Sequence, residues 1–317
     1  MKILIADALS DKALEILASA NLSADVKTGL KAEELQNIIG AYDAVIVRSA
    51  AKITRDIIAK GDKLKVIGRA GIGVDNVDVQ AATEKGIVVM NTPQGNALAA
   101  AEHTIGLMFA AARKIGIADR TMKEGKWEKK ALMGVEIYGK TLGVVGIGNI
   151  GIIVAEKAVA LGMRVLAYDI FVSKEFAASK GIELVDFDTL LKESDFISVH
   201  VPLVKETRGL INKDAIAKMK KSAIIINVAR GPVVIEKDLN DALREGRIAG
   251  AALDVFPSEP LPQDSPLWKL TNVIISPHIA GFSPHYDERA AGLFIQNLQR
   301  FLEELPLYNR LDLSLEY

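Results

Sequence analysis

Short apolar runs alternate with amphipathic segments through the first ninety residues of the chain. Segments 11–20, 32–39 and 54–59 carry apolar residues at the i, i+3 and i+4 spacing of a helix that buries one face. A strand–helix alternation of this kind favours a parallel sheet covered by helices on both faces. Buried strands are predicted at residues 3–6, 44–47, 65–68 and 87–89.

A second alternation begins at Lys140 and contains six apolar runs. Six strands with helical segments between them is the number expected of a complete dinucleotide-binding sheet. The chain is therefore predicted to be an α/β protein with two Rossmann-like units, each built on a doubly wound parallel sheet. The six strands are predicted at residues 142–145, 165–167, 196–199, 224–228, 251–253 and 273–275.

Two further segments bear on how these units are connected. The Ala-rich stretch 95–125 predicts one long helix that links the units and is buried over most of its length. The amphipathic segment 287–304 follows the last predicted strand and is expected to pack back on the first unit. The first unit, flavodoxin-like, would then comprise residues 1–95 and 287–317, with residues 96–286 inserted as the second unit.

Composition and charge exclude several classes of protein. The 39 Lys and Arg residues balance 40 Asp and Glu residues, which argues against binding to nucleic acid or to a membrane surface. The chain has no cysteine, which excludes disulfides, thiol catalysis and cysteine-ligated metals, and its four histidines lack ligand spacing, so no metal is expected. Neither a secretory signal nor a membrane-spanning apolar run is found, and a cytoplasmic location is expected.

A glycine-rich turn lies between the first strand of the second unit and a helical segment. It reads Gly146-Ile147-Gly148-Asn149-Ile150-Gly151, and its glycines would supply a tight turn, room for a pyrophosphate and close helix–sheet packing. Asp169 ends the next strand, where a carboxylate accepts hydrogen bonds from the ribose hydroxyls and repels a 2'-phosphate. The glycine turn and Asp169 together predict NAD as cofactor. The alternative is that the glycines close an ordinary loop. A similar run at 71–76 has Asn76 at the third glycine position and is interpreted as a tight loop at a sheet edge.

Three polar residues follow three late strands of the second unit: Arg230, Glu259 and His278. Because loops at the carboxyl ends of parallel strands converge, these residues are expected to share one site. A Glu stabilises a neighbouring imidazolium, and an Arg binds a carboxylate with two parallel hydrogen bonds. Each residue alone is ordinary, and His103, His200 and His285 are interpreted as structural. Together, on a nucleotide-binding unit, the three favour a nicotinamide-dependent oxidoreductase of a hydroxy acid.

With these residues identified, the chain resembles the D-isomer-specific 2-hydroxyacid dehydrogenase family over essentially its whole length. The branch that oxidises D-3-phosphoglycerate to 3-phosphohydroxypyruvate in serine biosynthesis is the most similar. As a set the matching motifs are specific to the family and less so to the substrate. They are 48–52, 68–78, 91–96, Lys126-Trp127, the glycine turn, 229–231, 252–256 and Pro277-His278.

The resemblance implies a role for each matching position. Arg230 would bind the substrate carboxylate, and His278 paired with Glu259 would be the acid or base. The first unit would be the substrate (catalytic) domain and the second the NAD-binding domain of a homodimer. Cofactor contacts are implied for Gly146, Gly148, Asn149, Ile150, Gly151, Asp169, Val201, Val228, Ala229, Arg230, Asp254, His278, Ala280 and Gly281, and substrate contacts for Arg48, Arg69, Gly71, Ile72 and, from the neighbouring subunit, Lys129.

Some features depart from the family pattern. Asn149 stands where many members carry Arg, so weaker NAD binding is expected. The segment 283–286 and the chain end are more similar to glyoxylate or hydroxypyruvate reductases, so a broad 2-ketoacid reductase is the alternative function. An NAD(H)-sensing protein similar to the corepressors of this fold is a second alternative. No extension long enough for a regulatory domain follows, so serine feedback through one is not expected. Trp127 and Trp268 are interpreted as packing anchors.

Overall fold

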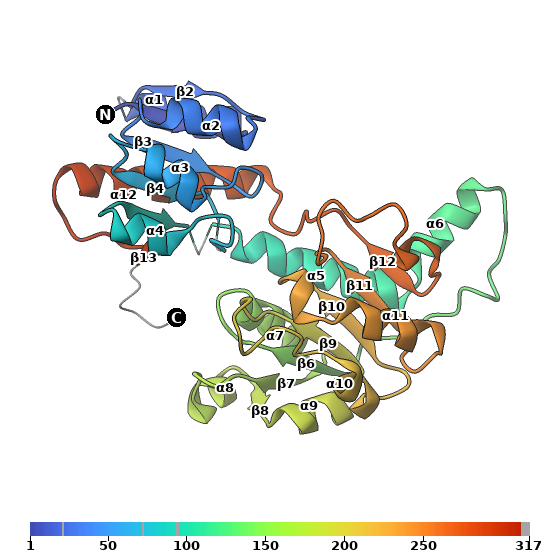
Figure 1. Cartoon of the computed structure of the whole chain (residues 1–317). Coiled ribbons are helices and arrows are strands. Elements are labelled where there is room, and N and C mark those ends of the chain that lie inside the picture. The colour runs from blue at the N-terminus through green and yellow to red at the C-terminus, as the bar shows by residue number, and fades with distance from the viewer. Residues whose placement is uncertain (21, 72, 93–94, 312–317) are drawn as a thin grey trace. The chain divides into compact units, whose positions relative to one another are not determined.

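The computed structural model of the chain describes residues 1–20, 22–71, 73–92 and 95–311 (Figure 1). It divides into two compact units, Met1–Asn96 with Phe282–Tyr317, and Ala97–Gly281. The sequence placed the second boundary at residue 286. The structure places it at 281 because Phe282 and Tyr286 already contact the first unit, where both rings lie against the Arg48 guanidinium.

The first unit has a sheet in the order β13-β5-β4-β3-β1-β2, and its five parallel strands follow the flavodoxin-like order. Sequence periodicity missed β2 and β13. The residues of β2 are not buried, and β13 has two residues and pairs antiparallel with β5, so neither carries an apolar run. The strands are β1 (Ile3–Ile5), β2 (Ala24–Val26), β3 (Ala44–Val47), β4 (Val66–Arg69), β5 (Val88–Asn91) and β13 (Arg310–Leu311).

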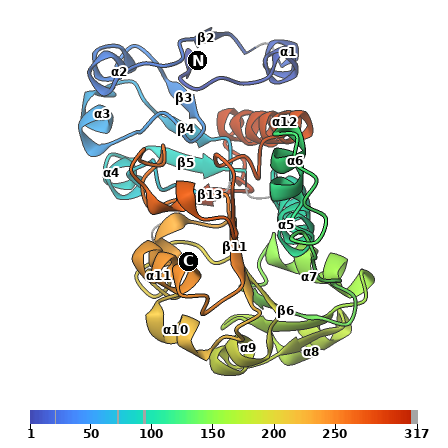
Figure 2. The same cartoon turned by 90° about the vertical axis from the view of Figure 1, so that its right-hand side faces the viewer.

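Helices cover both faces of this sheet, with α2, α3 and α4 on one face and α1 and α12 on the other (Figure 2). The return of α12 to the first unit agrees with its amphipathic pattern, since Phe294 and Leu298 are buried in the core. Gly68 of β4 permits this packing, because a Cβ there would lie 1.8 Å from the Phe294 ring. The helices are α1 (Asp11–Ser19), α2 (Ala32–Ile39), α3 (Arg55–Lys60), α4 (Val79–Glu84) and α12 (Pro284–Leu302).

The second unit has seven parallel strands in the order β12-β11-β10-β9-β6-β7-β8. This is the doubly wound dinucleotide-binding order with one strand more than the six expected. Periodicity missed β8, a three-residue edge strand in which only Ile182 is fully buried. The strands are β6 (Thr141–Val145), β7 (Arg164–Tyr168), β8 (Ile182–Leu184), β9 (Phe196–Val199), β10 (Ile224–Asn227), β11 (Gly250–Leu253) and β12 (Val273–Ile275).

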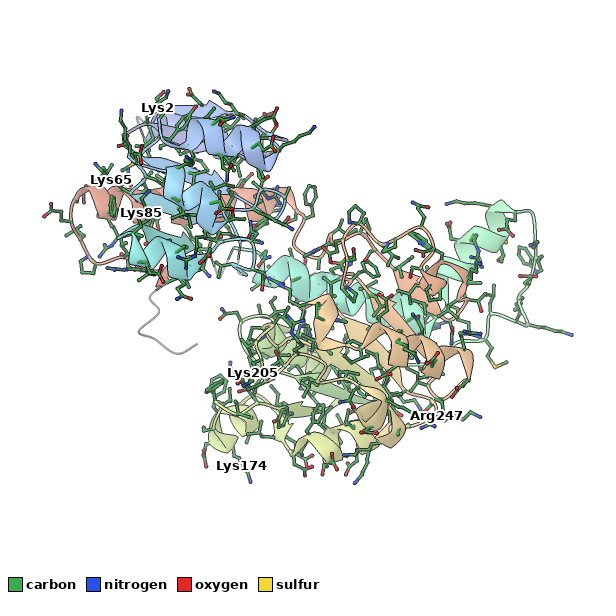
Figure 3. The ribbon with its side chains drawn as sticks, in the orientation of Figure 1. Lys2, Lys65, Lys85, Lys174, Lys205 and Arg247 are labelled. Atoms are coloured by element: carbon green, nitrogen blue, oxygen red, sulfur yellow. The ribbon has the colours of Figure 1, made fainter. Side chains whose placement is uncertain are left out.

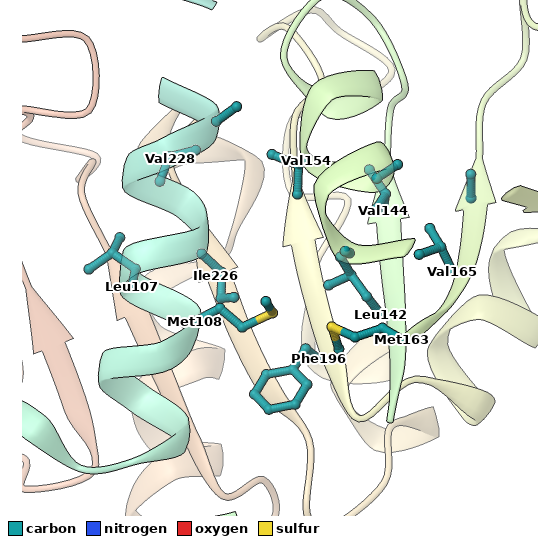
Figure 4. Close-up of a cluster of buried hydrophobic side chains, with 14 of the residues drawn as sticks. Leu107, Met108, Leu142, Val144, Val154, Met163, Val165, Phe196, Ile226 and Val228 are labelled. Atoms are coloured by element: carbon teal, nitrogen blue, oxygen red, sulfur yellow. The ribbon is translucent and has the colours of Figure 1, made fainter. Parts of the chain in front are cut away.

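The Ala-rich stretch forms two helices, so the prediction of one long buried helix was wrong. Lys114, between them, has a φ of 55°, which breaks the helix, and the second helix buries only Thr121. Leu107 and Met108 of the first helix pack near Ile226 in the core (Figure 4). The helices of this unit are α5 (Ala97–Ala112), α6 (Ile115–Lys123), α7 (Gly151–Ala160), α8 (Lys174–Ser179), α9 (Phe187–Glu193), α10 (Lys213–Lys218) and α11 (Glu236–Arg244), with 3-10 turns η1 (Gly231–Val233) and η2 (Pro266–Lys269).

Charged side chains cover the surfaces of both units (Figure 3). Lys85, labelled on the first unit, donates from Nζ to the backbone carbonyls of Ile58, Ala59 and Gly61 and so closes the end of α3. Trp127 and Trp268 are 80% and 52% exposed, so neither is the packing anchor that was expected. In the part of the chain that the structure describes, every helix is too short or too polar to cross a membrane.

Candidate active site

The glycine turn lies at the carboxyl end of β6, where the strand order of the second sheet reverses between β6 and β9. A Cβ on Gly151 would lie 2.0 Å from the carbonyl oxygen of Gly146, and Gly146 itself has a φ of 88°. At Gly148 a Cβ would meet nothing within 4 Å. Gly146 and Gly151 are therefore required by packing, whereas Gly148 keeps the space above the turn open.

The start of α7 follows the turn directly, with Ile150 at its N-cap and no side-chain cap on its amides. Amide groups in this position are unpaired donors that carry partial positive charge, which suits a phosphate. Asn149 is exposed on the same turn. Because the Asn149 side chain is uncharged, an anion at this turn would be bound mainly by the backbone amides at the start of α7.

Asp169, which follows β7, is bonded to the same turn. Its Oδ2 accepts a hydrogen bond from the Ile147 amide at 2.9 Å, and its Oδ1 accepts one from the Phe171 amide at 2.8 Å. A carboxylate has about four acceptor positions, so two remain for hydroxyl donors. Open space above Gly148, uncapped amides and a fixed carboxylate are the features that an adenosine diphosphate moiety needs, and the site fits NAD.

His200 lies directly below the glycine turn, a position that the sequence did not indicate. Its Cβ lies 3.4 Å from the Cβ position of Gly151, and its neighbour Val201 contacts Gly146. The ring Nε2 is 2.7 Å from Ser198 Oγ, while the buried Nδ1 has no hydrogen-bond partner among the described residues. Burial lowers the pKa of His200 to about 3, so this imidazole is neutral at physiological pH.

Glu259 and His278 meet at the carboxyl end of the same sheet. The Nδ1 of His278 lies 2.7 Å from Oε2 of Glu259, and Oε1 of Glu259 accepts a hydrogen bond from the Phe256 amide at 3.0 Å. Burial tends to raise the pKa of Glu259, but hydrogen bonds from His278 and Phe256 and the positive charge of Arg230 outweigh it and lower the pKa. Glu259 is therefore an ionised partner that orients the imidazole.

Arg230 comes to this pair from the end of β10. The side chain of Asn227 shapes the turn, since its Nδ2 donates to the Arg230 carbonyl and its Oδ1 accepts from the Ala229 amide, both at 3.0 Å. Arg230 Nη1 donates to the Ala229 carbonyl at 2.7 Å, and its charge acts on Glu259. The structure thus brings Arg230, Glu259 and His278 together from three loops.

Asp254, at the end of β11, is completely buried. It accepts hydrogen bonds from the amides of Ile279 and Ala280 at 2.9 and 2.7 Å and from Ser276 Oγ at 2.5 Å. Burial tends to raise its pKa, but the hydrogen bonds from His103, Ser276 and the two amides lower it. Asp254 therefore fixes the loop that carries His278. The remaining expected cofactor residues follow β10 and β12: Val228 and Ala280 are buried, and Ala229 and Gly281 are half-buried.

Arg48 and Arg69 lie in the first unit, after β3 and at the end of β4, two neighbouring strands. The Arg48 guanidinium lies 5.0 Å from the centre of the Phe282 ring and 5.2 Å from that of Tyr286. Gly71 has a φ of 151°, and a Cβ there would lie 1.2 Å from Arg69 Nη1. The two guanidinium groups therefore share the carboxyl edge of this sheet. Ile72 lies outside the described residues.

Of the run 71–76, Gly71 and residues 73–76 are loop residues that follow β4, an internal strand of the sheet rather than an edge strand. The Asn76 side chain closes this loop by donating to the carbonyls of Arg48 and Ala51 at 2.8 and 2.6 Å. Asn at the third glycine position is thus a structural requirement of the first unit.

Lys129 is exposed on the segment that follows α6. Over the described parts of the chain, no three His, Asp or Glu side chains are grouped so as to hold a metal ion.

The fold and the glycine turn of the second unit define a dinucleotide-binding protein of the Rossmann type. The sequence model of the D-isomer specific 2-hydroxyacid dehydrogenase NAD-binding domain matches residues 105–280. The chain therefore belongs to the D-isomer-specific 2-hydroxyacid dehydrogenase family, with its NAD-binding domain in the second unit.

Two curated relatives and one solved structure show how similar the chain is to other members. A D-3-phosphoglycerate dehydrogenase of Archaeoglobus fulgidus is 49% identical over 99% of this chain, which spans only 59% of that protein's length. A hydroxypyruvate reductase of Thermotoga maritima is 47% identical over 95% of this chain and 97% of its own length. The crystal structure of TT0316 protein from Thermus thermophilus superposes with a TM-score of 0.89 at 35% identity, over 98% of this chain and all of that one.

Proposed function

We propose that this protein catalyses the NAD-dependent oxidation of D-3-phosphoglycerate to 3-phosphohydroxypyruvate, as the first step of serine synthesis in the cytoplasm. The observation that carries the proposal is the 2.7 Å contact between His278 and Glu259 beside Arg230, at the carboxyl edge of the NAD-binding sheet. The 49% identity to a D-3-phosphoglycerate dehydrogenase supports this choice of substrate.

The hydrogen bond to Glu259 determines which nitrogen of His278 can act as the base. An ionised carboxylate only accepts hydrogen bonds, so Nδ1 of His278 carries a proton and Nε2 of the neutral ring has a free lone pair. Nε2 would take the proton of the substrate's C2 hydroxyl, and Arg230 would hold the adjacent carboxylate. Bound NAD supplies the acceptor for the C2 hydride. In the reverse reduction the His278 imidazolium returns the proton.

Arg48 and Arg69 are proposed to bind the phosphate of the substrate. Both guanidinium groups come from the carboxyl edge of one sheet, and the Phe282 and Tyr286 rings limit the orientations open to Arg48. A planar guanidinium held in one orientation presents its N–H edge to a phosphate without further loss of side-chain freedom.

A homodimer is proposed, with Lys129 contributed to the neighbouring subunit's site. The segment around Lys129 exposes Trp127, Met133 and Tyr138, each about four-fifths accessible to solvent in the single chain. Apolar side chains gathered on an irregular segment are typical of a surface that another protein covers. Sedimentation of the purified chain would test this assembly.

The proposed substrate is tested by steady-state kinetics with phosphoglycerate, phosphohydroxypyruvate, hydroxypyruvate and glyoxylate. Arg48→Ala and Arg69→Ala should each raise the KM for the phosphorylated acids by at least about tenfold, the usual worth of a charge-assisted contact, and leave the KM for glyoxylate nearly unchanged. Arg55→Ala is the matched control, since Arg55 pairs with Glu84 at 2.7 Å on a helix of the same unit.

The second candidate is a glyoxylate or hydroxypyruvate reductase. The observation in its favour is that the Thermotoga maritima hydroxypyruvate reductase matches this chain over 97% of its own length. Equal effects of both arginine substitutions on all substrates, or turnover of the unphosphorylated acids alone, would select this function and reject phosphoglycerate.

A further inference from the structure

The loop that carries His278 is held by the buried carboxylate of Asp254. His278 itself has a φ of 54°, a left-handed conformation that is strained for a residue other than glycine. The two amides that follow it, of Ile279 and Ala280, donate to the two oxygens of Asp254. The amide of His278 donates to the Ser276 carbonyl at 3.0 Å. The catalytic imidazole is therefore oriented by a strained turn whose stability depends on Asp254.

Asp254 is in turn connected to helix α5 through Ser276 and His103. Ser276 Oγ lies 2.5 Å from Asp254 Oδ1 and 3.2 Å from Nε2 of His103, and His103 Nε2 is 3.5 Å from the same carboxylate oxygen. A hydroxyl has one proton, and the carboxylate can only accept, so Ser276 donates to Asp254. The Ser276 oxygen must then accept from His103, which means that His103 carries its proton on Nε2.

His103 differs from its neighbours on α5, which is otherwise mostly apolar. Glu102 turns toward Lys157, at 3.8 Å, and the Thr104 hydroxyl bonds to the Ala100 carbonyl within the helix. Only His103 among these adjacent polar residues reaches Asp254, and three quarters of its side chain is shielded from solvent. A polar side chain on this apolar helix costs stability unless it is hydrogen-bonded, and the Ser276–Asp254 pair provides that bond.

We propose that His103 is a positioning residue for the reaction, acting through Ser276 and Asp254 to hold the turn that presents His278 to Glu259. This inference deepens the proposed function and rests on it for its kinetic consequence. In this arrangement the Nε2–H group of His103 donates to the Ser276 oxygen and so keeps the Ser276 hydroxyl directed at Asp254. Both carboxylate oxygens of Asp254 then accept hydrogen bonds from the amides of the turn.

The experiment measures hydrogen–deuterium exchange of the Ile279 and Ala280 amides in the intact protein, together with kcat. His103→Leu should raise exchange and lower kcat by about tenfold each, the worth of one hydrogen bond to a charged network. His103→Gln, whose amide can place a donor near Nε2, should restore both to within about threefold. Thr104→Val, which removes a buried hydroxyl that does not touch Asp254, should change neither.

A double-mutant cycle tests the path of the effect. If His103 acts through Ser276, His103→Leu combined with Ser276→Ala should cost no more than about the larger single effect. Additive effects, or a His103→Gln variant as impaired as His103→Leu, would reject the proposal, as would unchanged exchange in His103→Leu. If His103→Leu does not fold, the Gln and Ser276→Ala variants decide. The exchange data need no substrate, so failure of the proposed reaction would leave them interpretable.

Discussion

The Nδ1 atom of His278 lies 2.7 Å from Oε2 of Glu259 although 19 positions separate the two residues in the chain. Each residue lies in the loop after one of two paired strands, β11 and β12, whose register places Leu253 beside Ile275. Parallel pairing directs both strand ends to the same edge of the sheet. The fold therefore brings the two loops together, and the turn at His278 then directs the imidazole toward Glu259.

Removing the imidazole should abolish most of the turnover. His278→Ala is expected to lower kcat by roughly two to four powers of ten, the usual contribution of a positioned proton-transfer group. Absorbance of the reduced nicotinamide in steady-state assays measures this. Turnover equal to that of the unaltered protein would remove His278 from the mechanism.

Removing the charge of Glu259 should lower the rate. The lowered pKa of Glu259 keeps it ionised through the neutral range, where it accepts the hydrogen bond from Nδ1 of His278 and so orients the ring. Glu259→Gln should lower kcat/KM for oxidation roughly a hundredfold in steady-state assays, because the side chain that orients the base loses its charge. Glu245→Gln, on an exposed helix end, is the control, and an unchanged kcat/KM in Glu259→Gln would contradict this role.

Two glycines of the turn should respond in opposite ways to the same substitution. Gly148→Ala adds a methyl group to open space, so the free energy of unfolding should stay within about 1 kcal/mol while the KM for NAD rises about tenfold. Gly151→Ala places a Cβ 2.0 Å from a backbone oxygen and should destabilise the protein by about 1–3 kcal/mol. Urea unfolding and NAD titration of both variants check this. Unimpaired NAD binding in Gly148→Ala would argue against a pyrophosphate above the turn.

Asp169 should determine the preference between the two nicotinamide dinucleotides. Asp169→Asn keeps an oxygen for the Ile147 amide but removes the charge that repels a 2'-phosphate. The ratio of kcat/KM for NADP to that for NAD should rise by about tenfold, as expected when one repulsive charge near the surface is lost. Glu175→Gln, an exposed carboxylate on the following helix, should leave the ratio unchanged. A constant ratio in Asp169→Asn would assign discrimination to other residues.

His200 should make the stability of the protein depend on pH. Its pKa is about 3 in the folded protein and about 6.5 in an unfolded chain, so between these values only the unfolded state binds the proton. The contribution of His200 to the free energy of unfolding is complete above pH 6.5. It declines as the pH falls, by at most about 2 kcal/mol at pH 5. In urea unfolding, the free energy of unfolding of His200→Gln should therefore fall by up to about 2 kcal/mol less than that of the unaltered protein between pH 7 and pH 5. An identical pH dependence in both proteins would show that His200 is protonated without cost.

The sequence alone was sufficient where local pattern and chemistry coincide. Apolar periodicity predicted β3 and β9 at their observed limits, because every residue of these two strands is buried. The run Val273–Ile275 predicted β12 as well, although the residues of that edge strand are only half-buried. The spacing of the glycines and Asp169 predicted a dinucleotide unit, since that motif is contained in one strand–turn–helix–strand segment. Periodicity failed at β2, β8 and β13, where short edge strands lack an apolar run, and at Lys114, where a single left-handed residue ends α5.

By itself the sequence determined the class of fold, the cofactor and which side chains could do the chemistry, because these depend on residue types and local spacing. Only the tertiary structure decided the geometry of the expected contact between Glu259 and His278, that Asp254 holds the turn behind His278, and that His103 lies beside Asp254 and His200 beside the glycine turn. These contacts join residues from different strands and helices. They arise because parallel strands end at one edge of a sheet, an arrangement that depends on the folding of the whole unit and leaves no periodic trace in the chain.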